Sequence, residues 1–505
     1  LFSVLFTACN GIGDEITHRS PEPTPTTEQT EPQPLAEALE PTPEQPVVSD
    51  DTYQNVDPTG QVVTFWHTYT AENEAVLQEI ITDFNAANPW NIQVTAEYQG
   101  DHTDIFNKML TFMNTEDAPG LVVAHQNQAA TYQLGKSLID IDQLVYSEKW
   151  GLSQEEIDDF FSAPFDQDIF PTFDNIRLGF PTHRAMDVLF YNQDWLTELG
   201  YDGPPNTPDE FKEMACAAAA QPFSGATAQG NIGYQLSVDA PRFASWTFAF
   251  GGDIFDENTA QYSFDRPEAV EAMLFLQNLI NDGCASLVSE PNADQVGFSQ
   301  GTTLFTTGSS SALNFYQSAV QAESNHNWSV APIPHNSQNP VQNIYGSSIS
   351  IPKTSPENQL AAWLFLKHLT SPENQAKWVI QSHDLPVRAS AAGYLNDYFA
   401  ANPAFAIAFE MLPFGRSEPA VAGYEEVGEM VAESMFAITQ GADAASVLAD
   451  LNADANANLQ EQLAAIPETP DSWAEVDPSG QTITFWHQQP AARHAPLDEL
   501  IWKFN

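Results

Sequence analysis

Apolar and polar positions follow two different periods along the chain, and these periods predict strands and helices in turn. Residues 61–66 (QVVTFW) are rich in β-branched and aromatic side chains, which predicts a strand. Directly afterwards the apolar residues recur with the spacing of one helical face, at Val76, Leu77, Ile80, Ile81 and Phe84. A strand followed at once by an amphipathic helix therefore opens the folded part of the chain.

The same alternation continues beyond this first pair. Residues 91–98 and 120–124 predict strands, and residues 104–113 predict a helix between them. Later segments predict helices at 361–369, at 371–379 after an N-cap Ser and a Pro, and at 445–466. Strands that alternate with helices indicate an α/β fold with a mostly parallel sheet covered by helices.

The opening segment returns near the end of the chain. Residues 56–85 align with residues 476–505 at an offset of 420 (476 − 56), with sixteen of thirty aligned positions identical. A period this long suits one large domain rather than a short structural repeat. We therefore expect one complete domain over residues 53–468 and the start of a second, truncated domain over residues 469–505.

The residues before the first domain have the composition of an anchor and a spacer. Residues 1–9 end in Phe6-Thr-Ala-Cys9, which is similar to a bacterial lipobox at the end of a signal peptide. Residues 10–52 contain a tract rich in Pro, Thr and Glu that cannot bury enough apolar surface to fold. We expect acylation of Cys9 and a disordered linker, which together place the domain at the outer face of the cytoplasmic membrane or in the periplasm.

Composition limits the classes of partner. The chain of 505 residues is 42% hydrophobic and 17% charged, as in globular proteins, and has no apolar run of about 18 residues that would span a membrane. The formal net charge is −52, from 68 acidic and 16 basic residues. Nucleic acids are bound mainly through Lys and Arg, so they are excluded, and anionic membranes and ligands are repelled at long range.

Two cysteines, Cys216 and Cys284, lie inside the expected domain. Disulfides persist in the oxidising compartments that an exported protein enters, so we expect these two residues to form a bridge. Two free buried thiols are the alternative.

Several segments, in order, resemble one family. They are residues 64–67 (TFWH), 118–125 (APGLVVAH), 188–192 (VLFYN), 301–311 (GTTLFTTGSSS), 345–351 (YGSSISI) and 385–388 (LPVR). The chain resembles the extracellular solute-binding proteins of ABC importers, in the sugar-binding group that includes maltose-binding and glycerol-phosphate-binding proteins. The resemblance implies a two-lobed, type II-like periplasmic-binding-protein fold with the ligand between the lobes. It assigns residues 60–186 and 302–343 to lobe one, and 190–300 and 344–440 to lobe two.

The resemblance also gives candidate ligand residues in lobe one. His67 and Thr68 directly follow the first strand, where ligands of open α/β sheets bind. Gln126 and Asn127 stand where maltose-binding members place an Asp-Arg pair, and their amides offer both donors and acceptors to hydroxyl groups. A structural hydrogen-bonding role for His67 is the alternative.

Other candidates lie at turns and on aromatic side chains. Ser309 and Ser310 belong to a Gly-Ser turn, and Tyr345, Gly346 and Ser347 form the entry turn of lobe two, where Gly346 allows close backbone approach.

Three further residues have a structural alternative beside the functional one. Trp246 is a possible stacking platform or plain core, and Arg388 is a ligand contact or a structural ion pair. Tyr424 lies where members of the family often place an aromatic residue on a late helix.

The predicted function is binding without catalysis: capture of a sugar or oligosaccharide for an ABC permease, with no cofactor and no metal. Glycerol 3-phosphate or another polyol phosphate is the alternative ligand, because residues 65–67 resemble that subgroup. Residues 418–431 lack the basic side chains that a phosphate site favours. A sensory receptor and a secreted glycoside hydrolase are alternatives of other classes, and a hydrolase requires two opposed carboxyl groups.

Overall fold

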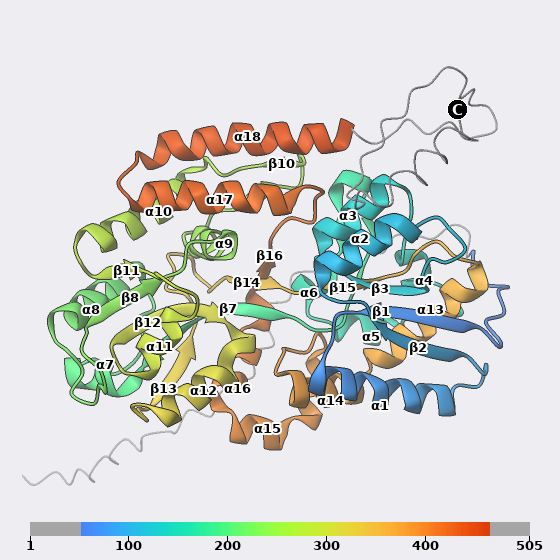
Figure 1. The fold of residues 1–505 in the computed structure, drawn as a ribbon, viewed down its shortest axis with the longest axis horizontal. Coiled ribbons are helices and arrows are strands. Elements are labelled where there is room, and N and C mark those ends of the chain that lie inside the picture. Colours follow the sequence, from blue (N-terminus) through green and yellow to red (C-terminus); the bar gives the residue numbers. More distant parts are fainter. Residues whose placement is uncertain (1–51, 465–505) are drawn as a thin grey trace, which may run out of the picture. The chain divides into compact units, whose positions relative to one another are not determined.

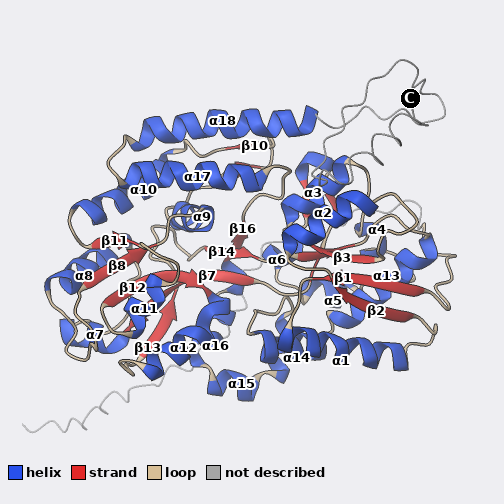
Figure 2. Ribbon diagram, viewed as in Figure 1, coloured by secondary structure: helices blue, strands red, loops and turns tan. Residues whose placement is uncertain are grey.

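A computed structural model describes residues 52–464. The predicted anchor at Cys9, the linker up to residue 51 and the repeated segment after residue 468 lie outside the described residues. In the described part the chain forms two large sheets with helices on both faces of each, an α/β arrangement, and two small two-stranded hairpins (Figures 1 and 2).

The first sheet has the strand order β2-β1-β3-β15-β6. Strand β1 runs parallel to both β2 and β3, whereas β15 runs antiparallel to β3 and to β6. The bounds are β1 (Val62–His67), β2 (Gln93–Tyr98), β3 (Leu121–Ala124), β6 (Phe180–Pro181) and β15 (Ser348–Ser350). A small hairpin of β4 (Ile169–Phe170) and β5 (Ile176–Arg177) accompanies this sheet.

The helices of this lobe come from two separate stretches of the described chain. They are α1 (Ala71–Ala87), α2 (His102–Phe112), α3 (Gln126–Leu134), α4 (Asp142–Val145), α5 (Gln154–Asp158), α6 (Ser162–Asp166), α13 (Pro356–Leu369) and α14 (Pro372–Ser382). The predicted apolar face of α1 is buried as expected, from Val76 to Phe84. Val63 and Phe65 of β1 pack on this side, and Trp66 points to the opposite face, so the alternation of the strand supplies both layers.

The second sheet has the order β11-β8-β12-β7-β14-β16, with β13 paired beside β14 on the same edge of β7. All eight residues of β7 are buried, which suits its place at the centre. The bounds are β7 (Ala185–Asn192), β8 (Ile232–Leu236), β11 (Ala285–Leu287), β12 (Thr303–Ser309), β13 (Trp328–Ala331), β14 (Gln342–Tyr345) and β16 (Gly415–Ser417), with a separate hairpin of β9 (Phe255–Asp256) and β10 (Gln261–Tyr262).

The helices of the second lobe are α7 (Gln193–Leu199), α8 (Pro208–Ala220), α9 (Ala240–Ala249), α10 (Pro267–Asn281), α11 (Ala293–Ser299), α12 (Leu313–Ala322), α15 (Asn396–Ala401), α16 (Pro403–Glu410), α17 (Tyr424–Thr439) and α18 (Ala444–Ala464). In Figure 1, α17 and α18 run side by side. The predicted helix at 445–466 is present as α18, and its face with Leu448, Leu451, Ala455 and Leu459 is buried.

The chain passes between the lobes at three crossovers: residues 182–184 between β6 and β7, residues 346–347 between β14 and β15, and the segment that follows α14 from residue 383. Two of the predicted lobe assignments are therefore wrong. Residues 302–343 belong to the second lobe, because β12 pairs with β7 and β8. Residues 348–382 belong to the first lobe, because β15 pairs with β3 and β6 and α13 packs on β1. These pairings join residues far apart in sequence, which local pattern does not encode.

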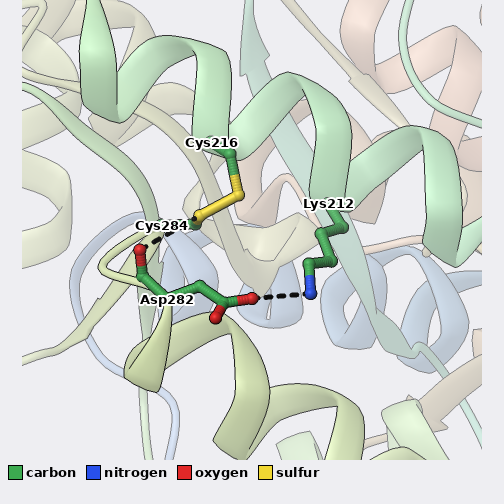
Figure 3. Close-up of a disulfide and its surroundings, with 4 residues drawn as sticks. All are labelled: Lys212, Cys216, Asp282 and Cys284. Carbon is green, nitrogen blue, oxygen red and sulfur yellow. Dashed lines mark hydrogen bonds and ion pairs between the residues drawn. A yellow bond between two sulfur atoms is a disulfide. The ribbon is translucent and has the colours of Figure 1, made fainter.

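A disulfide joins Cys216 on α8 to Cys284 just before β11, so the predicted bridge is present (Figure 3). Their Cα atoms are 4.4 Å apart, and 68 positions separate them in sequence. Lys212 of α8 and Asp282 form an ion pair of 2.6 Å beside the bridge. The bridge thus fastens α8 to the edge of the second sheet.

Candidate functional site

Polar side chains gather around the crossovers, in one group on each lobe. In the lobe-one group the centre is Arg184, which is fully buried in the first crossover. Its Nη2 lies 3.1 Å from Asp168 Oδ2 and donates to Ser348 Oγ at 2.8 Å, and its Nη1 donates to the carbonyl of Ser347 at 3.2 Å. Burial lowers the pKa of Arg184, and Asp168 partly offsets this effect. The guanidinium therefore ties two crossovers to the first lobe.

Gln126 belongs to the same group and was predicted from sequence. Its Nε2 donates to Asp168 Oδ1 at 3.0 Å, and it lies 3.3 Å from both the Gly346 carbonyl and Ser348 Oγ. The side chain is partly exposed at the start of α3. Gln126 therefore reaches from the end of β3 to the second crossover.

Two histidines stand next to Gln126. The rings of His102, at the start of α2, and His125, at the end of β3, have centroids 4.1 Å apart. Burial, with His102 and Arg184 nearby, lowers the pKa of His125 to about 4, and burial also lowers that of His102. Both imidazoles are therefore neutral at pH 7, and a neutral imidazole offers one donor and one acceptor.

The lobe-two group centres on Asp187, which is fully buried in β7. Its carboxylate accepts hydrogen bonds from Ser245 Oγ at 2.6 Å and from the Tyr345 hydroxyl at 2.8 Å, and lies 3.4 Å from Arg242 Nη1. Arg242 is also 3.7 Å from Asp239, the N-cap of α9. Burial alone would lower the pKa of Arg242, but these two carboxylates raise it, so the guanidinium stays charged.

The predicted turn residues meet the same group. Ser310 Oγ accepts a hydrogen bond from the Met186 amide at 3.1 Å, and Ser309 Oγ lies 2.8 Å from Ser311 Oγ. Gly346 has φ +149°, and a Cβ there would lie 3.3 Å from the His183 carbonyl, so close backbone approach explains the glycine. The ends of β12, β7 and β14 thus come together at the crossovers.

A third feature is the segment from Glu418 to Tyr424, between β16 and α17. Glu418 accepts hydrogen bonds from Asn343 Nδ2 at 2.9 Å and from the Tyr424 hydroxyl at 2.5 Å, and burial raises its pKa. Ala420 and Ala422 are buried in the hydrophobic cluster of the first lobe that contains Trp66. This segment of the second lobe therefore contacts the first lobe directly.

Three predicted residues contact other parts of the protein. Trp246 is fully buried in the core and its Nε1 donates to the Tyr234 hydroxyl at 3.1 Å, so the interpretation as core holds. Arg388 forms an ion pair of 2.7 Å with Asp159 and lies over the Phe160 ring. His67 is fully buried, and its ring stacks on Tyr69.

The structure does not bring the side chains of Trp246, Arg388 and His67 to the crossover groups. Thr68 and Asn127 are partly exposed, directly after β1 and in the first turn of α3.

Sequence reasoning missed Arg184 and Asp187. Both lie in the segment 183–192 (HRAMDVLFYN), where charged residues interrupt or border an apolar strand, and this interruption was an available signal. The carboxyl groups of Asp168 and Glu418 carry no local signal, since they bond Ser348 and Asn343, which are distant in sequence. Asp239 is different, because its partner Arg242 is only three residues away.

Among residues 52–464, no group of three or more His, Cys, Asp or Glu side chains is placed to hold a metal ion. In the same range, no helix is both long enough and apolar enough to cross a membrane.

The comparisons with known proteins agree with this geometry. Residues 79–407, well over half of the chain, match the family model of the bacterial extracellular solute-binding proteins. The chain belongs to this family. Its relatives include the sn-glycerol-3-phosphate-binding periplasmic proteins UgpB of Shigella dysenteriae, 24% identical over 357 residues, and of Escherichia coli K12, 23% identical over 357 residues. Each alignment covers 68% of this chain and 78% of the relative.

Solved structures of this class share the fold. The sugar-binding protein MalE of Xanthomonas citri has a TM-score of 0.69 at 19% identity, over 81% of this chain and 100% of that protein. The cyclic alpha-maltosyl-1,6-maltose binding protein of Arthrobacter globiformis has a TM-score of 0.68 at 20% identity, over 79% and 99%. UgpB of Mycobacterium tuberculosis, in complex with glycerophosphocholine, has a TM-score of 0.63 at 21% identity, over 80% and 100%. The predicted two-lobed solute-binding fold is confirmed.

Proposed function

We propose that this protein captures a neutral sugar or oligosaccharide between its lobes and delivers it to the permease of an ABC importer. The observation that carries the choice of ligand is the charge balance at the crossovers. Arg184 is paired with Asp168 and Arg242 with Asp187 and Asp239. On β16, Arg416 Nη1 lies 3.4 Å from Asp253 and donates to the Gly252 carbonyl at 3.0 Å.

These pairs leave the site unfavourable for a phosphate. A phosphate site needs cationic or amide donors that are free to turn toward the ligand. Here each of the three arginines already faces a carboxylate, and Glu418 adds a further acidic group beside the second lobe's cluster. Sugar hydroxyls, by contrast, are well served by carboxylates, amides and neutral imidazoles, which accept and donate in fixed directions.

Binding without catalysis is part of the proposal. Hydrolysis of a glycoside requires two carboxyl groups that flank the scissile bond, one of them protonated. Asp168 and Asp187 instead each accept several hydrogen bonds from the protein itself, which supports a positioning role.

The second candidate ligand is glycerol 3-phosphate or another polyol phosphate, favoured by the names of the relatives at 23–24% identity. A thermal-shift panel of neutral mono- and oligosaccharides and of polyol phosphates, followed by calorimetric titration of each hit, separates the two. Our proposal expects stabilisation by a neutral sugar and none by glycerol 3-phosphate. Tight binding of the phosphate, with no response to any neutral sugar, would overturn it.

The variant Arg242→Met provides a second test of whether the ligand is a neutral sugar or a phosphate. If Arg242 positions Asp187 and Asp239 for sugar hydroxyls, the substitution weakens sugar binding, and the affinity for the sugar does not depend on salt. If Arg242 binds a phosphate, the affinity of the wild type falls steeply as salt rises, and this dependence disappears in the variant.

We further propose that Cys9 carries a lipid anchor, on the strength of residues 6–9 and the Pro-rich tract that follows them. Expression of the full precursor with Cys9→Ser in its native host type should move the protein from the membrane fraction to the soluble fraction. Unchanged fractionation of this variant would refute the anchor.

A further inference from the structure

Two of the crossovers are bonded to each other at their centre. The Arg184 amide donates to the Leu385 carbonyl at 2.9 Å, and the Leu385 amide donates to the Arg184 carbonyl at 2.7 Å. His383, the C-cap residue directly after α14, has φ +61°, a left-handed conformation that is unusual for residues other than glycine. A hinge motion between the lobes changes backbone angles in these segments.

A histidine and an aspartate, both partly exposed, flank this bond, one from each crossover. His183 Nε2 lies 3.9 Å from Asp384 Oδ2, and the two side chains are only 12% and 18% exposed. The His183 ring stacks on Trp378 with centroids 5.2 Å apart, meets Tyr69 at 5.9 Å, and its Nδ1 lies 3.0 Å from Thr182 Oγ1. The separation of 3.9 Å is too long for a hydrogen bond, so the pair is close but not joined.

The surrounding titratable and charged groups leave Asp384 without a direct cationic partner in this geometry. On the first crossover, Arg184 is engaged by Asp168. Around the pair stand also His102 of α2, Glu72 of α1, Tyr69, His383 and Tyr398 of α15. His383 Nδ1 lies 2.5 Å from the Tyr398 hydroxyl, so that ring is already hydrogen-bonded.

We propose that His183 and Asp384 form a proton-operated switch in the hinge: a protonated Asp384 favours the hinge geometry seen here, and an ionised Asp384 favours opening of the lobes. Opening rotates the crossovers and admits water to Asp384. An ionised carboxylate gains more from that water than a neutral carboxyl does. The device is distinct from ligand recognition, because neither side chain belongs to the groups around Asp187 and Gln126.

The direction follows from the titration of the two groups. Burial raises the pKa of Asp384 from its ordinary 3.8 to about 6, and burial together with Arg184 lowers the pKa of His183 to about 3. Between pH 3 and 6 both groups are therefore neutral in this geometry, and above pH 6 a carboxylate faces a neutral imidazole. At low pH, the raised pKa of Asp384 stabilises the hinge geometry in which Asp384 is protonated. This stabilisation is lost as pH rises toward 6. A difference of about 2 pKa units changes the ratio of open to closed lobes by at most about 100-fold.

The test measures the distance between the lobes without any ligand. Spin labels are placed on exposed positions of α2 and α17 (Thr103→Cys and Glu429→Cys) in the full chain with Cys9→Ser and the disulfide intact. Double electron–electron resonance at pH 5.0 and 7.5 then gives the distance distribution. We expect a larger population of short distances at pH 5.0 than at pH 7.5, and across a pH series the midpoint of the change should fall between about pH 4 and pH 6.

Two variants and a control make the outcome specific. Asp384→Asn removes the charge and should give the short distances at both pH values. Ser382→Ala removes a hydrogen bond that lowers the pKa of Asp384, so it should move the midpoint upward. His326→Gln, which alters a buried imidazole of the second lobe away from the hinge, should keep the wild-type response. A wild-type distribution that does not change with pH would overturn the proposal, as would a shift that persists in Asp384→Asn.

Discussion

The pair of Asp168 and Arg184 is the point at which the crossovers are fastened to the first lobe, and its removal has a calculable effect. In Asp168→Asn the side chain keeps its shape but loses its charge. The Arg184 guanidinium, fully buried, then has no carboxylate beside it, and Ser348 Oγ and Gln126 Nε2 lose a charged acceptor. Loss of one partner of a buried ion pair costs about 3–5 kcal/mol of unfolding free energy.

This cost converts to a shift in melting temperature through the size of the described domain. Residues 52–464 number 413 (464 − 52 + 1). At about 2.1 cal/mol/K per residue the entropy of unfolding is about 0.9 kcal/mol/K, so the melting temperature should fall by about 3–6 °C. Ligand affinity should fall by about tenfold or more, because Gln126 loses a hydrogen bond to a charged group.

A matched control separates stability from binding. Arg177 and Asp142 form a second, partly buried ion pair of the first lobe, with Nε and Oδ1 2.6 Å apart, but neither touches Gln126. Asp142→Asn should therefore lower the melting temperature in scanning calorimetry without a change in ligand affinity. The reasoning is refuted if Asp168→Asn melts within 1 °C of the wild type, or if both variants bind ligand equally.

Two further predictions concern stability. The double variant Cys216→Ser and Cys284→Ser should lose about 4 kcal/mol of unfolding free energy, the loop-closure value for a 68-residue separation. Its urea midpoint should therefore be lower than that of the wild type, and equal midpoints would contradict this. The pKa of His125 is lowered from 6.5 to about 4, so the unfolded chain binds the proton first and the folded state loses stability as pH falls from 6.5 to 4. His125→Asn should flatten this part of the urea-midpoint profile, and an unchanged slope would show that His125 is not responsible.

Much of the architecture was accessible from sequence because it depends on local periodicity. The apolar face of α1 from Val76 to Phe84 is buried as predicted, and the helix predicted at 445–466 is present as α18. The lobe membership of β12 and β15 was not accessible, because it depends on pairing with β7 and β3 across long stretches of chain.

The candidate site divides in the same way. Gln126, Ser310 and Gly346 lie at the crossovers, where turn residues after strands were expected. Arg184 and Asp187 were missed, since an ion pair with Asp168 or Arg242 is a long-range event that spacing does not reveal. Trp246 was predicted as a stacking platform or as core, and in the structure its side chain is fully buried in the core.

The most direct test of the account is native mass spectrometry of the protein purified without denaturation from its own host type, with the bound mass released and identified. The account predicts a neutral carbohydrate at one per chain, and its removal should lower the melting temperature. At a ligand concentration of 100 times the Kd the stabilisation is about 2.7 kcal/mol, which corresponds to about 3 °C for a domain of this size. A bound phosphate ester, restored by titration with the same compound and not by any neutral sugar, would contradict the account.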